Sequence, residues 1–304
     1  MLLLGIDVGT SSIKVSVVNA ADTTLVASAR FPETEAAIIA HHPGWAEQEP
    51  ESWWQYTCQA IHKLNTSGSF DPRDISAIGI AYQMHGLVIV DKNKKVLRPS
   101  IIWCDSRAVE TGEKAFTAIG PAWCREHLLN SPGNFTASKL AWVKEHEPAI
   151  FENVDKLMLP GDYIAMRLTQ EITSSPAALS EAVLWNFQSD TVARPVMDHY
   201  GFPDALIPPV QPVFSIHGKV TPEVAATLGL QPGIPVSYKA GDQPNNALSL
   251  NVMNAGEIAA TAGTSGVIYA VSDRLTGDPQ SRVNSFAHVN HTAAEKSIGI
   301  LLCI

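Results

Sequence analysis

The 304-residue sequence has few cysteines and no long apolar run. Its four cysteines (Cys58, Cys104, Cys124 and Cys303) are widely spaced and form no CxxC pair, which argues against a disulfide framework and indicates reduced thiols. No apolar run approaches the ~18 residues that a membrane span requires. The first residues carry no cationic lead and reach an acidic side chain at Asp7, unlike a secretory signal. We therefore expect a cytoplasmic protein with no membrane partner.

Basic residues are also scarce. Lysine and arginine number 21 against 30 aspartates and glutamates, which gives a formal net charge of −9. The resulting field repels nucleic-acid phosphates, so nucleic acid is not an expected partner. Any bound phosphate must instead be held locally, by backbone N–H groups or a metal ion. The sequence has no GxxxxGK[ST] loop and no GxGxxG turn after a strand, which excludes the two commonest nucleotide-binding folds. Its histidines and cysteines show no zinc-ligand spacing.

The order of apolar patterns and turn residues predicts an α/β protein. A chain of this length is expected to fold into two domains. We place the boundary near residue 252, between 1–252 and 253–304. Strands are predicted over 2–7, 13–18, 24–29, 75–81 (resuming at 87–90), 101–103, 236–240, 257–262 and 267–271, with a terminal apolar strand from 297. Helices are predicted over 49–64, 106–118, 136–146, 160–168, near 222–229 and from 243.

The most informative local pattern is the turn Gly9-Thr10-Ser11-Ser12, which follows Asp7 between the first two strands. Successive N–H groups of a small-residue turn can form a nest for an anion. Magnesium keeps most of its waters and takes one or two carboxylates plus phosphate oxygens, so Asp7 beside this turn fits a magnesium–phosphate site. An ordinary hairpin turn is the alternative, because such turns are common. The segment 261–266 has the same strand–turn–strand form.

Asp242 lies between a predicted strand and a predicted helix, in Gly241-Asp242-Gln243. Aspartate is a favoured N-cap, so capping the helix is one interpretation. A general base that faces a cleft between two domains is the other. The two are compatible, and the sequence leaves both open.

Two further polar segments lie at the ends of strands, Gln83-Met84-His85-Gly86 and Trp103-Cys104-Asp105. Strand ends are the usual place for ligands in open α/β sheets. Taken alone, His85 is more often a hydrogen-bonded structural histidine than a ligand. Both segments are therefore candidate binding segments, but other motifs must provide the context that assigns them a function.

Taken in order, seven segments provide that context, because they resemble the FGGY carbohydrate kinases over essentially the whole chain. Trp45–Gln48 and Gln83–Gly86 point to the members that phosphorylate D-xylulose rather than glycerol. The seven segments are 5–11 (GIDVGTS), 45–50 (WAEQEP), 83–86 (QMHG), 97–103 (LRPSIIW), 159–163 (LPGDY), 241–242 (GD) and 262–266 (AGTSG).

The resemblance implies an actin/hexokinase-like fold, in which two ribonuclease H-like domains close over a cleft. Each such domain has a mixed five-stranded sheet flanked by helices. Residues 1–252 would be the sugar-binding domain with the first phosphate turn, and 253–304 the start of the ATP-binding domain. The implied activity is phosphorylation of a pentulose, D-xylulose, with ATP and Mg²⁺ as cofactors and with the sugar and ATP as partners.

Residue by residue, the resemblance implies Asp242 as the catalytic base and Asp7 as the acid that organises Mg²⁺ through water. Met84 and His85 match the sugar-binding pair. The remaining residues that it implies are Gln83, Trp103 and Asp105 in the substrate segments, Gly9, Thr10, Ser11 and Lys14 in the first phosphate turn, and Gly263, Thr264 and Ser265 in the second.

Two departures from the family pattern leave alternatives open. Many members have Asn-Ala-Ala-Gly after the aspartate, where this chain has Gln243-Pro244-Asn245-Asn246, so ribulose, gluconate or glycerol stays open as the substrate. The sequence also ends before the family's glycine-rich adenosine segment, so we expect a truncated second domain. A non-catalytic sugar-binding fragment is therefore an alternative, as is a homodimer. An ATPase of the actin or heat-shock type is a weaker alternative, because the segment Gln83–Gly86 would have no role in it.

Overall fold

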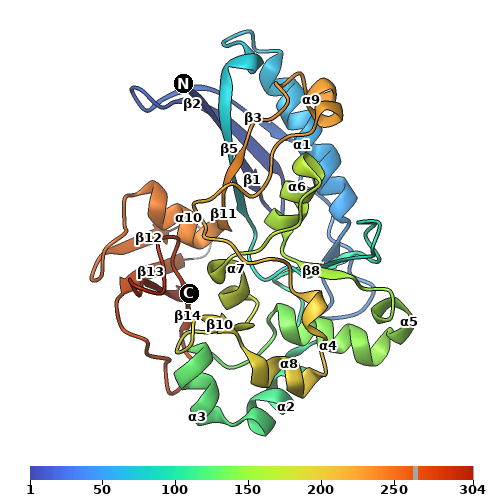
Figure 1. Cartoon of the computed structure of the whole chain (residues 1–304), viewed down its shortest axis with the longest axis vertical. Helices are drawn as coiled ribbons and strands as arrows, with labels where there is room; N and C mark the ends of the chain where they lie inside the picture. The colour runs from blue at the N-terminus through green and yellow to red at the C-terminus, as the bar shows by residue number, and fades with distance from the viewer. Residues whose placement is uncertain (263–265, 304) are drawn as a thin grey trace.

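A mixed five-stranded sheet forms the upper half of the molecule in the computed structural model, which describes residues 1–262 and 266–303 (Figure 1). The strands lie in the order β11 (Val236–Gly241), β5 (Ile75–Tyr82), β1 (Leu2–Val8), β2 (Ile13–Asn19) and β3 (Thr24–Phe31). β1 pairs antiparallel with β2 and parallel with β5. β11 also pairs parallel with β5, and β3 antiparallel with β2. The mixed sheet and its strands predicted over 2–7, 13–18, 24–29, 75–81 and 236–240 are confirmed. The strand predicted over 101–103 is wrong beyond residue 101, because the strand there covers only Ser100–Ile101 and lies outside this sheet.

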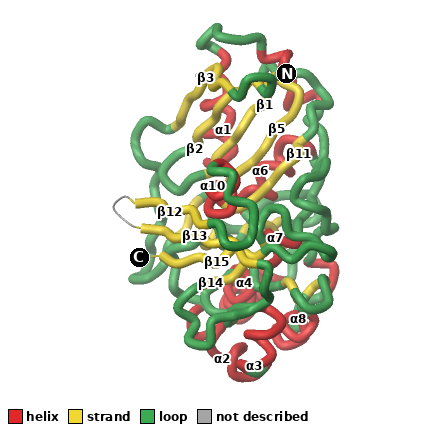
Figure 2. The backbone as a smooth tube through the Cα atoms, turned by 90° about the vertical axis from the view of Figure 1, so that its left-hand side faces the viewer, coloured by secondary structure: helices red, strands yellow, loops and turns green. Residues whose placement is uncertain are grey.

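The two faces of this sheet differ in their cover. In β1 the side chains of Leu4, Ile6 and Val8 are almost fully buried and point to the face covered by α1 (Pro50–Asn65) and α6 (Pro160–Thr169), which lie behind the sheet in Figure 2. Gly5 and Asp7 point to the opposite face, because successive side chains of a strand alternate. The alternation of side chains along the strand therefore decides which β1 residues join this core and which reach the opposite face.

The strand predicted over 75–81 does not resume at 87–90 in the same sheet, so that expectation is wrong. Residues 88–90 form β6 (Val88–Val90), which pairs with β8 (Lys156–Met158) in a separate two-stranded sheet. His85 has a φ of 62°, a left-handed conformation that an extended strand does not contain. This residue turns the chain out of the main sheet and leaves Gln83–Gly86 as a loop at the end of β5.

The remaining helices and short strands pack around and below the main sheet (Figure 1). Nearly all of the predicted helices are present within two residues of the expected ends, although the helix predicted to begin at 106 begins at Val109. The helices are α2 (Val109–Ile119), α3 (Pro121–Trp123), α4 (Thr136–His146), α5 (Pro148–Phe151), α7 (Pro176–Glu181), α8 (Arg194–Tyr200), α9 (Pro222–Leu228) and α10 (Asp242–Ser249), with a π turn at Cys124–Leu128 and 3₁₀ turns at Pro72–Asp74 and Asp204–Leu206. The short strands are β4 (Glu47–Gln48) paired with β7 (Ser100–Ile101), and β9 (Trp185–Asn186) paired with β10 (Thr191–Val192).

A second sheet follows α10, in the order β12 (Ile258–Ala262), β13 (Gly266–Ser272), β15 (Ile298–Cys303) and β14 (Asn284–Ala287). The predicted hairpin and terminal strand are thus confirmed as parts of one antiparallel sheet. One face of this sheet packs on Met84 and Ala247 through Tyr269 and Leu301. Among the described helices, none is long and apolar enough to cross a membrane.

Candidate functional site

A cavity of about 340 Å³ lies between the loops at the end of the five-stranded sheet and the second sheet. Its size is in the range of small-ligand pockets, which begin at about 300 Å³. The first part of the chain supplies its polar wall and the second sheet supplies a mostly apolar one. The lining residues are Thr10, Met84, His85, Trp103, Asp242 and Gln243 on the first side and Gly266, Val267, Leu301 and Cys303 on the second.

Asp242 enters this cavity from the first turn of α10. Gly241 is the N-cap residue of that helix and Asp242 is its first residue, so the N-cap interpretation of Asp242 is wrong. A Cβ atom at Gly241 would lie 2.6 Å from Met84 Cγ and 3.1 Å from Glu181 Oε2. Only glycine therefore lets β11 pass this close to Met84 and deliver Asp242 to the cavity wall.

The environment of Asp242 favours its protonated form more than water does. Burial raises the pKa of this carboxyl from 3.8 to about 6, and repulsion from Asp7 adds to the increase, against hydrogen bonds from Gln243. A carboxylate whose pKa lies near the working pH is a stronger base than an ordinary aspartate and is still ionised at neutral pH. Perturbed acids of this kind concentrate at functional sites.

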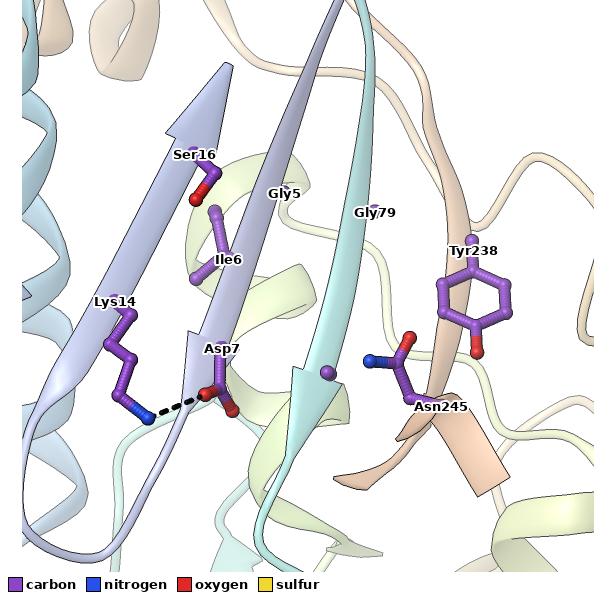
Figure 3. Close-up of a pocket in the computed structure, with 9 residues that line it drawn as sticks. Gly5, Ile6, Asp7, Lys14, Ser16, Gly79, Tyr238 and Asn245 are labelled. Carbon is purple, nitrogen blue, oxygen red and sulfur yellow. Dashed lines mark hydrogen bonds and ion pairs between the residues drawn. The ribbon is translucent and has the colours of Figure 1, made fainter. Parts of the chain in front are cut away.

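Asp7 lies at the end of β1 beside a second cavity of about 320 Å³ (Figure 3). Its Oδ2 atom is 3.4 Å from Lys14 Nζ, and the two side chains are 37% and 61% exposed, so this ion pair is weak and available to a ligand. Among the described residues, no group of three or more His, Cys, Asp or Glu side chains is placed to hold a metal ion. Asp7 and the nearby Asp242 instead fit a largely hydrated Mg²⁺, which needs only one or two carboxylates.

The turn after Asp7 is tight, and hydrogen bonds join it to Gln83 and Trp103. A Cβ atom at Gly9 would lie 2.9 Å from the Ser12 carbonyl oxygen, which explains the glycine. Thr10 Oγ1 donates to Gln83 Oε1 at 3.2 Å and accepts from Trp103 Nε1 at 3.0 Å. These two hydrogen bonds connect the turn to both Gln83 and Trp103. The second predicted turn, Gly263-Thr264-Ser265, lies outside the described residues.

Two predicted ligand residues lie behind the cavity wall in this structure. The Gln83 side chain is buried and donates to Gln48 Oε1 at 3.1 Å. Asp105 is 1% exposed, and its carboxylate accepts from the Ala46 N–H at 2.6 Å and from Arg107 Nη2 at 2.7 Å. The structure therefore brings Met84, His85, Trp103 and Asp242 together around the cavity and uses Gln83 and Asp105 to support them.

His85 presents a hydrogen-bond acceptor. Its Nδ1 lies 3.0 Å from the Glu181 carbonyl oxygen, and because a carbonyl can only accept, Nδ1 carries the hydrogen. Burial and the charge of Lys139 lower the pKa of His85 to about 3, so the ring is neutral and Nε2 keeps its lone pair. The ring packs against Phe135 and Phe286, with centroids 4.8 Å and 5.1 Å away. A ligand hydroxyl at this wall is expected to donate to Nε2.

Sequence reasoning missed two buried ionisable residues behind the site. Burial raises the pKa of the Glu181 carboxyl well above its usual value, and its Oε1 accepts from Tyr82 Oη at 2.6 Å. Lys139 is fully buried on α4. Helical phase gave no signal for Lys139, because every residue of α4 from Thr136 to Val143 is buried. Glu181 gave no signal either, since it ends a six-residue helix that was not predicted.

A mixed five-stranded sheet that carries a small-residue turn after one strand and an aspartate after another, both beside a cavity, is typical of the actin/hexokinase-like class of proteins. The FGGY carbohydrate-kinase N-terminal domain matches residues 2–249. The chain belongs to the FGGY family of carbohydrate kinases. The resemblance inferred from the seven segments is thereby confirmed.

Similar proteins with curated names are xylulose kinases. The chain is 34% identical to the xylulose kinase of Escherichia coli over 94% of its length and 58% of that protein, and 35% identical to that of Klebsiella pneumoniae with the same coverage. It thus spans less than two thirds of these relatives. The solved xylulose kinase of Rhodospirillum rubrum superposes with a TM-score of 0.89 at 27% identity, over 100% of this chain and 60% of that one. Gluconate kinase from Lactobacillus acidophilus, 21% identical, has a TM-score of 0.88, so the fold alone does not separate the substrates.

Proposed function

We propose that this chain is the sugar-binding part of an ATP-dependent kinase that phosphorylates a pentulose, D-xylulose. The observation that carries the proposal is the shared cavity of Asp242 and His85, in which a carboxylate with a raised pKa and a neutral imidazole acceptor face the same space. A polyol can donate one hydroxyl to each of them. The names of the similar proteins support D-xylulose as the sugar.

In this proposal Asp242 is the general base. Its carboxylate accepts the proton of the sugar hydroxyl as that oxygen attacks the γ-phosphorus. His85 Nε2 and the Met84 side chain hold the rest of the sugar, so that the reacting hydroxyl stays at Asp242. Trp103 and the second sheet cover the cavity and limit the access of water, which otherwise competes as the acceptor.

Asp7 and the N–H groups of Gly9, Thr10 and Ser11 would hold the magnesium–phosphate end of the nucleotide, with Lys14 beside them. ATP with Mg²⁺ supplies the phosphoryl group and the neutralising charge. Gly263, Thr264 and Ser265 are proposed as a second phosphate turn from the resemblance. We also propose that residues 1–252 are the sugar-binding domain and residues 253–304 the start of the ATP-binding domain, in a cytoplasmic enzyme.

The sugar preference can be tested on the chain itself, because the cavity lies within it. We expect D-xylulose to bind more tightly than gluconate or glycerol in isothermal titration, since a buried acceptor such as His85 Nε2 is left unpaired by a ligand that lacks the matching hydroxyl. His85→Phe should weaken binding of D-xylulose about tenfold or more, because one buried hydrogen bond is lost. His199→Phe, on the exposed side of α8, is the matched control. Tighter binding of glycerol than of D-xylulose would contradict the substrate assignment.

A homodimer remains a proposal, and the second sheet is where we place its interface. On the face away from the core, Ile258 and Ile268 are 61% and 37% exposed, on neighbouring strands of one sheet. Exposed apolar sheet faces with a free edge strand promote association. We expect light scattering to report a dimer of the 304-residue chain and Ile258→Lys with Ile268→Lys to yield monomer. A wild-type monomer at high protein concentration would remove this interface.

A further inference from the structure

A buried lysine connects the two loops that form the sugar side of the cavity. Lys139 lies on α4, and none of its side chain is exposed. Its Nζ donates to the carbonyl oxygen of His85 at 2.8 Å and to that of Ile102 at 3.0 Å. His85 lines the cavity itself, and Ile102 immediately precedes Trp103, which also lines it. One side chain therefore holds the backbone of both walls.

We propose that Lys139 is a positioning residue for the sugar. By binding both carbonyls it fixes the spacing of the Gln83–Gly86 loop and the Ile102–Trp103 segment, and with it the direction in which His85 Nε2 faces the cavity. This inference rests on the proposed sugar-binding function of that cavity. It assigns Lys139 no contact with the sugar or the phosphate.

The backbone of His85 shows why such a tether is needed. Its φ of 62° is a left-handed conformation, which is uncommon for a residue with a Cβ and costs free energy that the surroundings must supply. The Nζ–carbonyl bond of Lys139 acts on this residue directly, and the Glu181 carbonyl holds the ring from the other side. Without the lysine, the buried His85 carbonyl has no partner, and a rotation of the loop that exposes it to water becomes favourable.

The cost of burying Lys139 also indicates a specific purpose. Burial lowers the pKa of this amine to about 7, with Asp105 and Cys104 opposing the shift and Arg107 adding to it. A leucine or methionine in the same helical phase would pack without that desolvation penalty. A lysine placed here is explained by the two carbonyls it reaches, and both belong to loops of the same cavity.

A second lysine on the same helix provides a matched control. Lys144 Nζ donates to the carbonyl oxygens of Tyr200 and Gly201, at 2.6 Å and 2.8 Å. It therefore makes the same kind of two-carbonyl contact, but it joins α4 to α8 and not to the cavity. Lys144→Met should lower stability without changing the sugar site.

The experiment compares Lys139→Met, which removes the donors, Lys139→Gln, which keeps an N–H₂ donor on a shorter side chain, and Lys144→Met. The first measurement is the ¹⁵N spectrum of the His85 ring in the sugar-free chain, and the second is D-xylulose affinity by isothermal titration. For Lys139→Met we expect loss of the pure Nδ1–H form of His85 and an affinity about tenfold lower, the size of one unsatisfied buried carbonyl. Lys139→Gln should lie between Lys139→Met and the wild type, and Lys144→Met should match the wild type.

A folded Lys139→Met chain with an unchanged His85 spectrum and an affinity within twofold of the wild type overturns the proposal. Where that variant does not fold, Lys139→Gln decides by the same criterion. Its donor sits one bond closer to the backbone than Nζ, so full retention of both readouts would show that the two-carbonyl contact of the lysine is dispensable. A wild-type chain that binds no sugar contradicts the proposed function instead. In that case the His85 spectrum still decides whether Lys139 positions the ring.

Discussion

Asp242→Asn is expected to reduce phosphoryl transfer by about 10²–10⁴-fold, the usual contribution of a general base, while leaving sugar binding largely intact. An asparagine can still hydrogen-bond the hydroxyl, but it cannot take its proton in the transition state. The rate is to be measured as kcat in a full-length kinase that contains this chain, and the affinity by isothermal titration. Asp198→Asn on exposed α8 is the matched control. Near-normal turnover would remove Asp242 from the role of base, and loss of sugar affinity would make it mainly a ligand.

The same variant should stabilise the fold at neutral pH, an effect that the 304-residue chain can report by urea unfolding. Because the folded pKa of Asp242 is about 6 and the usual value is 3.8, the native state holds more protons than the unfolded state between these values. The wild-type free energy of unfolding therefore falls as pH rises through this window.

The full shift in the pKa of Asp242 corresponds to about 3 kcal/mol, which partial solvent access reduces to about 2 kcal/mol. We expect Asp242→Asn to be more stable by about that amount at pH 7.5, with a smaller difference at pH 4.5. An equal difference at both pH values would contradict the raised pKa.

The largest stability effect is expected at a buried ion pair behind the site. Lys239 on β11 and Asp162 on α6 are each 2% exposed, with Lys239 Nζ 2.5 Å from Asp162 Oδ1 and 2.7 Å from the Thr173 carbonyl oxygen. Lys239→Met leaves the Asp162 carboxylate buried without its cation. We expect a loss of about 3–5 kcal/mol in the free energy of unfolding, since breaking a buried pair costs more than the pair contributes.

A double-mutant cycle separates this penalty from the loss of packing. Asp162→Asn with Lys239→Met removes both charges, so we expect the double variant to recover part of the loss, by urea unfolding at pH 7.5. The exposed pair Lys114–Glu110, 2.8 Å apart on the surface of α2, is the control, and Lys114→Met should cost only about 0.5 kcal/mol. A Lys239→Met chain within about 1 kcal/mol of the wild type would show that the carboxylate finds another partner or a proton. β11 ends at Gly241, directly before Asp242, so Lys239 lies on the strand that leads to the proposed base.

Local patterns in the sequence determined most of the elements and the family. An apolar run over 2–7, alternation over 13–18 and a turn signal before 24–29 predicted β1, β2 and β3. The turn at Gly9 was visible as a run of small, hydroxyl-bearing residues, and the structure adds the reason for the glycine, because a Cβ atom there would lie 2.9 Å from the Ser12 carbonyl oxygen. The seven segments in order then identified the FGGY family, which the family match confirmed.

Only the tertiary structure decided which of the predicted polar residues face the cavity. Gln83 and Asp105 have the same residue types and the same strand-end positions as true lining residues, yet their side chains bond to Gln48 and Arg107 behind the wall. Likewise, Lys139 and Glu181 come from helices far along the chain from His85. A sequence pattern reports the period of one element, whereas the direction of a polar side chain depends on partners that other elements supply. The candidate residues of the site could therefore be named from the chain, but which of them line the cavity and which support it required the fold.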